Sequence, residues 1–306
     1  MTGILVLEQS LNGLQFGLML FLLAAGLTLV FGIMDMINLA HGSLYMVGAY
    51  LIAAATGASG SFWLGLLAGI VGTAVFGMLL ELAVLRRLYR RDHLSQVLGT
   101  FAILLMCNEA VRWIWGSQPL TLNPPAALAG PVELLPGFWY PAFRLLVIGV
   151  GLAVALALWA LVTRTRVGMQ VRAGASDREM ALAMGVDVRR LFTAVFGVGA
   201  ALCAVAGGML GPLLAVQVGM GENILILAFV VIVIGGIGSV RGAFIGALLI
   251  GVVDTAARAL LPPLLERLAG PAAASDVAPA LASILIYLLM ASVLFWKPQG
   301  LFPAHG

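Results

Sequence analysis

Long apolar runs without charge are the feature that most restricts the fold of this chain. The first of them, residues 9–34, contains no acidic or basic side chain. About 20 mostly apolar residues in an α-helix are enough to cross the hydrocarbon layer of a bilayer. Similar runs recur as far as residue 296. The sequence therefore predicts a chain that crosses a membrane repeatedly and retains its first apolar run as a span.

Composition excludes the soluble classes of protein. Hydrophobic residues make up 62% of the chain and charged residues 9%, whereas about a quarter of the residues in a soluble domain are charged. A membrane β-barrel would show roughly 10-residue strands of alternating polarity, and these runs are continuous. We expect an all-α, polytopic transmembrane helical bundle that forms one domain over residues 1–306.

Polar clusters and Pro/Gly groups divide the chain into about eight to nine membrane segments. Residues 42–57 and 223–239 are short and rich in glycine, which is typical of broken or re-entrant helices but also fits two short crossings. The expected segments are residues 10–34, 42–57, 61–85, 94–115, 142–163, 191–215, 223–239, 242–261 and 278–296.

Arginine placement predicts the orientation in the membrane. Residues 86–91 hold four arginines and residues 164–190 hold six, which is ten of the 16 basic residues. Cytoplasmic loops carry an excess of Arg and Lys. Residues 116–141 contain neither and are rich in proline, so they should form an irregular external cap. Nine crossings then place the N-terminus outside and the C-terminus inside.

Small residues four positions apart indicate close helix packing. Gly13/Gly17, Gly65/Gly69, Gly207/Gly211 and Gly242/Gly246 all lie within expected segments. Such spacings allow helix backbones to approach closely where lipid offers no hydrophobic drive. They predict a packed bundle and indicate no particular function.

Between residues 32 and 43, polar residues separate the first apolar run from the second. Ionisable groups at membrane depth cost several kcal/mol unless they are paired or hydrated, so such a cluster indicates a functional site. Asn38, His41, Gly42 and Ser43 are our candidates for lining or gating a solute pathway. The alternative is a cytoplasmic turn in which Asn38 satisfies local backbone groups.

The 164–190 loop contains a candidate docking element. Ser176, Asp177 and Glu179 form the pattern of a capping box, which predicts the start of a short helix, and Gly185 predicts its end. Met180, Ala183 and Met184 would share one apolar edge. This edge suits a groove on a partner protein, although a helix lying on the bilayer surface fits the same pattern.

Several other classes of function find little support in the sequence. Cys107 and Cys203 lie in apolar runs without a CxxC partner, so we expect buried thiols, no metal site and no cofactor. The basic residues are dispersed at span ends, which argues against nucleic acid. Lys297 is not preceded by the glycine of a Walker A loop, so any ATP hydrolysis must come from a partner.

The sequence also argues against intramembrane serine protease chemistry. Ser59 lies in a GxSG pattern, and a serine nucleophile would need a histidine base beside it. His93 lies in a basic loop and His305 in the tail, so we interpret Ser59 as part of a polar turn.

Acidic and basic residues at helical spacing leave open the alternative that the protein is a stand-alone transporter or channel. Glu109 precedes Arg112 by three residues, and Asp254 precedes Arg258 by four. We interpret both as structural ion pairs near helix ends. A stand-alone secondary transporter or channel would use Asp35, His41 and the Glu109/Arg112 pair for ion coupling.

Five segments together resemble the integral-membrane permeases of branched-chain amino acid ABC importers, of the LivH type. The resemblance covers nearly the whole chain. The segments are residues 26–33 (GLTLVFGI), 36–42 (MINLAHG), 174–181 (GASDREMA), 235–239 (GGIGS) and 298–302 (PQGLF). Arg241 departs from the smaller residues that many members of the family carry there.

The resemblance implies an inner-membrane permease subunit that is not itself an enzyme. It implies a second homologous permease, two cytoplasmic ATPases and a periplasmic solute-binding protein as partners. It also makes residues 174–185 the helix that couples the permease to an ATPase. The family transports branched-chain amino acids, urea, amides and other small solutes, and this sequence does not select one of them.

Overall fold

The computed structural model describes residues 2–34, 36, 38–89 and 91–302. Helices dominate these residues, as predicted for an all-α bundle. They are α1 (Thr2–Met34), α2 (His41–Ser59), α3 (Phe62–Leu80), α4 (Arg86–Leu88), α5 (His93–Trp115), α6 (Ala142–Arg164), α7 (Arg166–Ser176), α8 (Arg178–Ala183), α9 (Val188–Leu210), α10 (Met220–Gly235), α11 (Val240–Ala269), α12 (Pro271–Asp276) and α13 (Ala278–Trp296).

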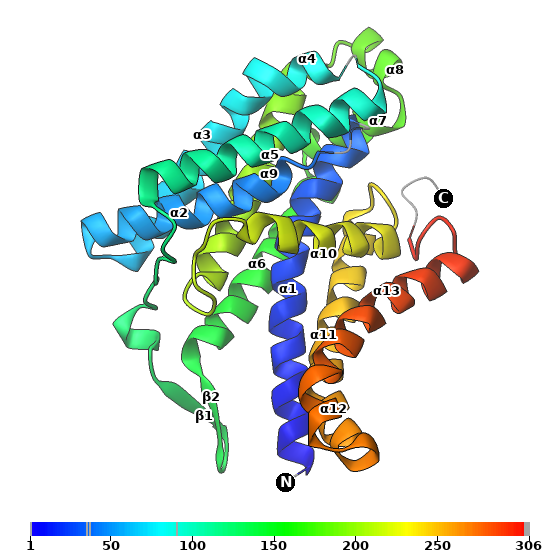
Figure 1. Ribbon diagram of the computed structural model, residues 1–306. Helices are drawn as coiled ribbons and strands as arrows, with labels where there is room; N and C mark the ends of the chain where they lie inside the picture. The colour runs from blue at the N-terminus through cyan, green and yellow to red at the C-terminus, as the bar shows by residue number, and fades with distance from the viewer. Residues whose placement is uncertain (1, 35, 37, 90, 303–306) are drawn as a thin grey trace.

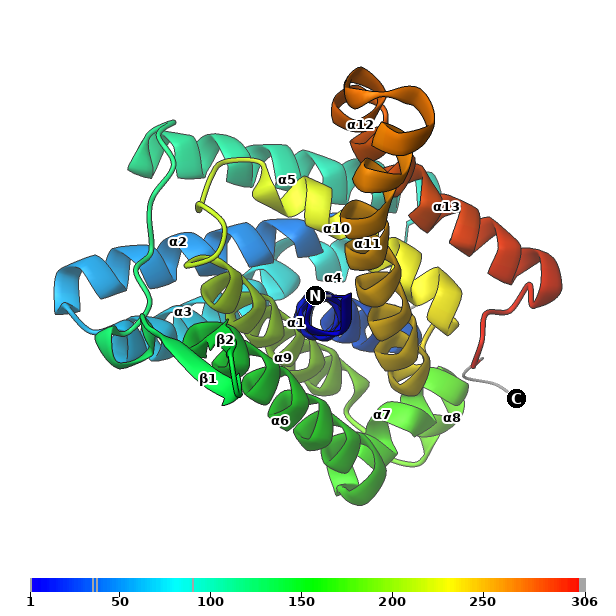
Figure 2. The same ribbon diagram turned by 90° about the horizontal axis from the view of Figure 1, so that it is seen from below.

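The helix α1 forms the centre of the bundle. Figure 2 shows it end-on, with α2, α9, α6 and α11 around it. Leu18, Leu20, Leu22 and Leu23 are fully buried although they point in different directions around the helix. A helix that is apolar on every side is suited to such an enclosed position.

Glycines set how closely α1 and α11 approach. A Cβ atom built on Gly17 would lie 2.8 Å from the carbonyl oxygen of Ala247, and one on Gly251 would lie 2.4 Å from the backbone nitrogen of Gly17. Contacts this short leave no room for a side chain. The predicted role of the small residues in helix packing is therefore confirmed at this interface.

Seven helices among the described residues are long and apolar enough to cross a membrane. They correspond to seven of the nine expected segments, and α2 and α10 account for the other two. The helix α10 has only 16 residues and lies across α1 in Figure 1. The helix α11 runs on to Ala269 through Pro262 and Pro263, beyond the expected end at residue 261.

The two arginine-rich loops lie at the same end of the bundle. Figure 1 shows α4, α7 and α8 together at one end, with the N-terminal end of α1 at the other. This arrangement agrees with the expectation that both loops face one side of the membrane. Which side is cytoplasmic stays a prediction.

The proline-rich loop is more regular than expected. It contains a short 3-10 turn, Ala126–Leu128, and an antiparallel hairpin of β1 (Pro131–Leu135) and β2 (Phe138–Pro141). Gly137 turns the chain with a φ of 81°, which costs glycine little. The prediction of a wholly irregular cap is wrong here because the prolines lie at the hairpin ends and turn.

Candidate functional site

The chain leaves α1 after Met34 and begins α2 at His41, and the junction between these helices lies inside the bundle. Asn38 is fully buried, and its side-chain oxygen accepts a hydrogen bond of 3.1 Å from the backbone N–H of Ala40. This is the local backbone role of an asparagine in a turn. Asp35, the acidic member of the sequence cluster, lies outside the described residues.

His41 begins α2 in the interior of the bundle. It is fully buried, and its Nε2 lies 3.1 Å from the Sγ of Cys203 on α9. A Cβ on Gly26 would be 2.9 Å from the same Nε2, and one on Gly199 would be 3.4 Å from the ring carbon Cε1. The imidazole therefore occupies space that two glycines leave open.

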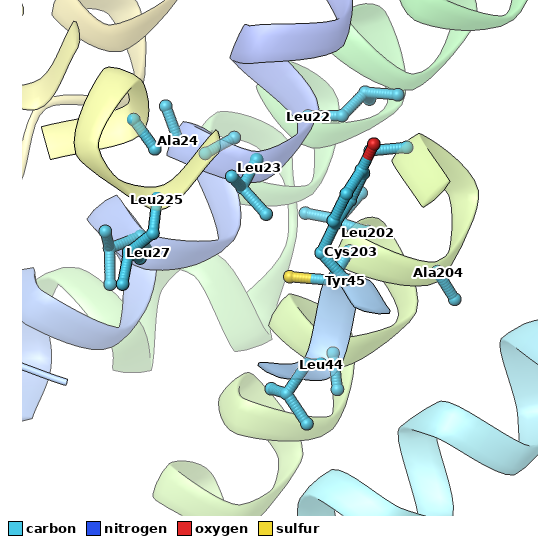
Figure 3. Close-up of a cluster of buried hydrophobic side chains, with 14 of the residues drawn as sticks. Leu22, Leu23, Ala24, Leu27, Leu44, Tyr45, Leu202, Cys203, Ala204 and Leu225 are labelled. Atoms are coloured by element: carbon cyan, nitrogen blue, oxygen red, sulfur yellow. The ribbon is translucent and has the colours of Figure 1, made fainter. Parts of the chain in front are cut away.

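Cys203, the partner of His41, belongs to a cluster of buried apolar side chains. Figure 3 shows a cluster drawn from α1, α2, α9 and α10, including Leu23, Leu44, Tyr45, Cys203 and Leu225. Cys203 is fully buried, as predicted. Its contact with His41 follows from a pairing of helices that the sequence pattern did not indicate.

The other two candidate residues, Gly42 and Ser43, have different surroundings. A Cβ on Gly42 would lie 2.6 Å from the carbonyl oxygen of Gly221 on α10, so this glycine permits a backbone contact between α2 and α10. Ser43 is buried, and its hydroxyl lies within hydrogen-bonding reach of the Cys107 thiol on α5. The structure thus brings Asn38, His41, Gly42 and Ser43 together at one buried junction.

Two of the sequence motifs meet at the far end of α10. The backbone N–H groups of Leu301 and Phe302 donate to the carbonyls of Ile234 and Gly235, at 2.8 and 2.9 Å. The guanidinium of Arg241 lies 5.3 Å from the centre of the Phe302 ring, a cation–π contact. Arg241 therefore helps to hold the C-terminal segment against the glycine-rich turn that follows α10.

The predicted docking helix forms, with one correction at its start. Asp177, not Ser176, is the N-cap of α8, and its carboxylate accepts a hydrogen bond of 2.9 Å from the N–H of Met180. Ser176 is instead the last residue of α7, so the capping-box assignment of Ser176 is wrong. The reason is that α7 extends through residues expected to form a loop. Glu179 lies in the first turn, where its charge favours the positive helix end.

The other end of α8 agrees with the prediction. Gly185 has a φ of 85°, its N–H donates to Leu182, and the N–H of Val186 donates to Ala181. This is the Schellman arrangement, which stops a helix. Met180 and Met184 are 60% and 79% exposed, so the apolar edge faces outward from the described part of the chain.

Both expected ion pairs form. Arg112 lies 3.0 Å from Glu109 with both side chains more than half exposed, and Arg258 lies 2.9 Å from the buried Asp254. Ser59 donates to the carbonyl of Ala55 at the exposed end of α2, as expected for a polar turn. These contacts serve local structure.

The sequence analysis missed a cluster of polar side chains around the buried carboxylate of Glu81. Glu81 is fully buried at the start of a π-helical turn, η1 (Glu81–Leu85), that joins α3 to α4. Its carboxylate accepts hydrogen bonds from Thr193 at 2.7 Å and from Arg86 and Tyr89 at 3.3 Å. The position of Glu81 inside an apolar run was the sequence feature that could have revealed this cluster.

Comparison with known proteins decides among the functional hypotheses. The family model for the permease component of branched-chain amino acid transport systems matches residues 9–294. The chain belongs to this permease family. The permease is therefore a membrane transport component and not an enzyme.

Relatives match the permease along most of its length. It is 32% identical to the high-affinity branched-chain amino acid transport system permease protein BraD of Pseudomonas aeruginosa, over 81% of this chain and 85% of BraD. It is 30% identical to LivH of Escherichia coli K12 over 96% of each chain. LivM of the same organism is 26% identical over 92% of this chain and 67% of LivM.

Proposed function

We propose that the permease imports branched-chain amino acids or related small solutes across the inner membrane as one subunit of an ABC importer. The names of BraD and LivH support this class of cargo. Similarity to both LivH and LivM supports a second homologous permease as partner. Two cytoplasmic ATPases and a periplasmic solute-binding protein complete the proposed complex.

The observation that carries the coupling step is the form of α8. This helix has only six residues, and so short a helix is marginal on its own. Asp177 fixes its first turn and Gly185 ends it. The result is a small rigid element that presents Met180 and Met184. We propose that this methionine edge enters an apolar groove on an ATPase and transmits the power stroke.

Met180→Asp tests this coupling function, because a carboxylate in an apolar groove loses its hydration. We expect a normally inserted permease whose ATPase copurification, solute-stimulated ATP hydrolysis and uptake each fall at least about tenfold, or about 1.4 kcal/mol. Leu182→Asp is the matched control. Leu182 is 50% exposed, but two residues of helix turn it about 200° away from Met180.

The control separates a specific contact from a general effect of charge on α8. Leu182→Asp should retain most of the ATPase binding and uptake. If Met180→Asp behaves like wild type, α8 is not the coupling element and a position on the bilayer surface replaces it. Equal losses in both variants would also contradict a contact made by the methionine edge.

We further propose that the junction of Asn38, His41, Gly42 and Ser43 gates the solute route. The broken helix and the buried polar atoms at this point support the proposal, since polar breaks at membrane depth occur beside cavities or inside protein. Full burial favours a gate that opens during transport over a wall that always faces the solute.

A further inference from the structure

The arginine-rich end of the bundle contains a cavity of about 500 Å³. It lies where the helix running from α3 through η1 into α4 meets the first turns of α9. Four arginines line it, namely Arg86, Arg87, Arg91 and Arg189, together with the buried Glu81. A cavity with four cations and one carboxylate favours an anionic occupant.

One of these arginines is fixed by the protein itself. The Nε and Nη2 atoms of Arg86 each lie 3.3 Å from the Glu81 carboxylate, and Nη2 also donates to the Thr193 hydroxyl at 2.8 Å. In a regular α-helix, residues five apart point about 140° away from each other. The π-helical turn changes this register and lets Glu81 hold Arg86 at the cavity wall.

The other three arginines have no carboxylate partner among the described residues. Arg87, Arg91 and Arg189 are exposed and form none of the salt bridges of the structure. The nearest acids along the chain are engaged elsewhere. Asp187 pairs with Arg190 at 3.0 Å, and hydrogen bonds from the hydroxyl and N–H of Ser95 lower the pKa of Asp92.

Apolar surface lies directly beside the arginine-lined cavity. An adjoining cavity of about 520 Å³ shares Arg86 and Arg189 and is also lined by Met78 and Leu82. Leu79 and Leu82 are 58% and 45% exposed on a span whose residues are mostly not buried. An occupant would therefore have a charged part beside the arginines and an apolar part along α3.

We propose that this arginine pocket binds the phosphate headgroup of an anionic phospholipid from the cytoplasmic leaflet, with the acyl chains lying along α3. Guanidinium groups match phosphate oxygens in bidentate geometry. Basic pockets between membrane helices on the cytoplasmic side suit such headgroups. A free anion or an acidic protein segment would make no use of the exposed leucines.

The test uses the full-length permease purified in detergent, with bound lipid counted by native mass spectrometry. The wild type should bind phosphatidylglycerol in preference to phosphatidylethanolamine with the same acyl chains. Arg87→Gln with Arg189→Gln should weaken phosphatidylglycerol binding about thirtyfold, equivalent to about 2 kcal/mol. The hydrogen bonds and salt bridge of Glu81 are made to Arg86, Tyr89 and Thr193 and not to these two arginines, so the Glu81–Arg86 cluster should stay intact.

The matched control removes two exposed arginines from the same end of the bundle. Arg164→Gln with Arg166→Gln should change phosphatidylglycerol binding less than about twofold, because net charge alone contributes weakly in salt. Equal binding of the two lipids, or an undiminished affinity in the Arg87/Arg189 variant, overturns the proposal.

Two further results would assign the pocket to another occupant and would also overturn the proposal. Displacement of phosphatidylglycerol by millimolar inorganic phosphate would indicate a free-anion site. Loss of copurifying ATPase in the Arg87/Arg189 variant, with lipid binding unchanged, would indicate a protein contact.

Discussion

His41 lies at a point where α1, α2 and α9 meet. Its ring fits between Gly26 and Gly199, and its Nε2 faces Cys203. A side chain at Gly26 would collide with the imidazole, because its Cβ would lie 2.9 Å from Nε2. The histidine is thus part of the packing as well as the proposed gate, and these two roles predict different mutant behaviour.

Replacement of His41 separates the roles. His41→Ala should leave a cavity that lowers the free energy of unfolding by about 2–4 kcal/mol, while the permease still inserts and assembles. If His41 gates the route, uptake should fall well beyond any loss of assembled complex. The measurement is uptake per assembled complex in proteoliposomes.

Cys203→Ala is the control for this experiment, because it removes the sulfur that faces His41 but keeps the histidine. It should preserve most of the uptake. Normal transport by His41→Ala would contradict the gate and leave His41 a purely structural residue.

At the scale of elements, the α7–α8 corner shows how two short helices share one turn. Ser176 ends α7, and Asp177 both follows it and caps α8. The cap hydrogen bond to Met180 orients the first turn of a six-residue helix. A single side chain therefore holds the first turn of the helix that presents the methionine edge.

Asp177→Ala should destabilise α8 by about 1 kcal/mol, the usual cost of losing a cap. This is small for the whole fold but large for so short a helix. We expect faster protease cleavage within residues 177–185 and weaker ATPase copurification. Ser176→Ala is the control and should behave like wild type in both assays. Equal effects of the two substitutions would show that Ser176 contributes to the cap after all.

The two ends of the whole molecule differ in charge. The arginine-rich segments around α4 and α7–α8 share one end, and the β1–β2 hairpin lies toward the end where α1 begins (Figure 1). Cytoplasmic loops are enriched in arginine, so the charge difference predicts that the arginine-rich end of the bundle faces the cytoplasm.

Cysteine labelling from outside sealed cells tests that orientation. Ala126→Cys in the proline-rich loop should react with a membrane-impermeant maleimide, and Ala173→Cys on α7 should react only after the cells are permeabilised. Both positions are exposed. Cys107 and Cys203 are buried, so background labelling should be low. Reaction of Ala173→Cys in sealed cells would reverse the assigned topology.

The sequence by itself determined the elements of this permease. Long apolar runs predicted the seven helices that are long and apolar enough to cross a membrane, and the glycine-rich runs 42–57 and 223–239 correspond to α2 and α10. The spacing of three or four residues between opposite charges predicted the Glu109–Arg112 and Asp254–Arg258 ion pairs. These features depend on hydropathy and helical spacing, which are local properties of the chain.

Only the tertiary structure decided which elements meet. His41 and Cys203 are 162 residues apart, and Glu81 and Thr193 are 112 apart, so no local pattern connects them. The π-helical turn that brings Arg86 to Glu81 breaks the spacing rule by which ion pairs are recognised. Such contacts follow from how the spans pack around α1. That packing is set by glycines and side-chain shapes acting across the whole bundle.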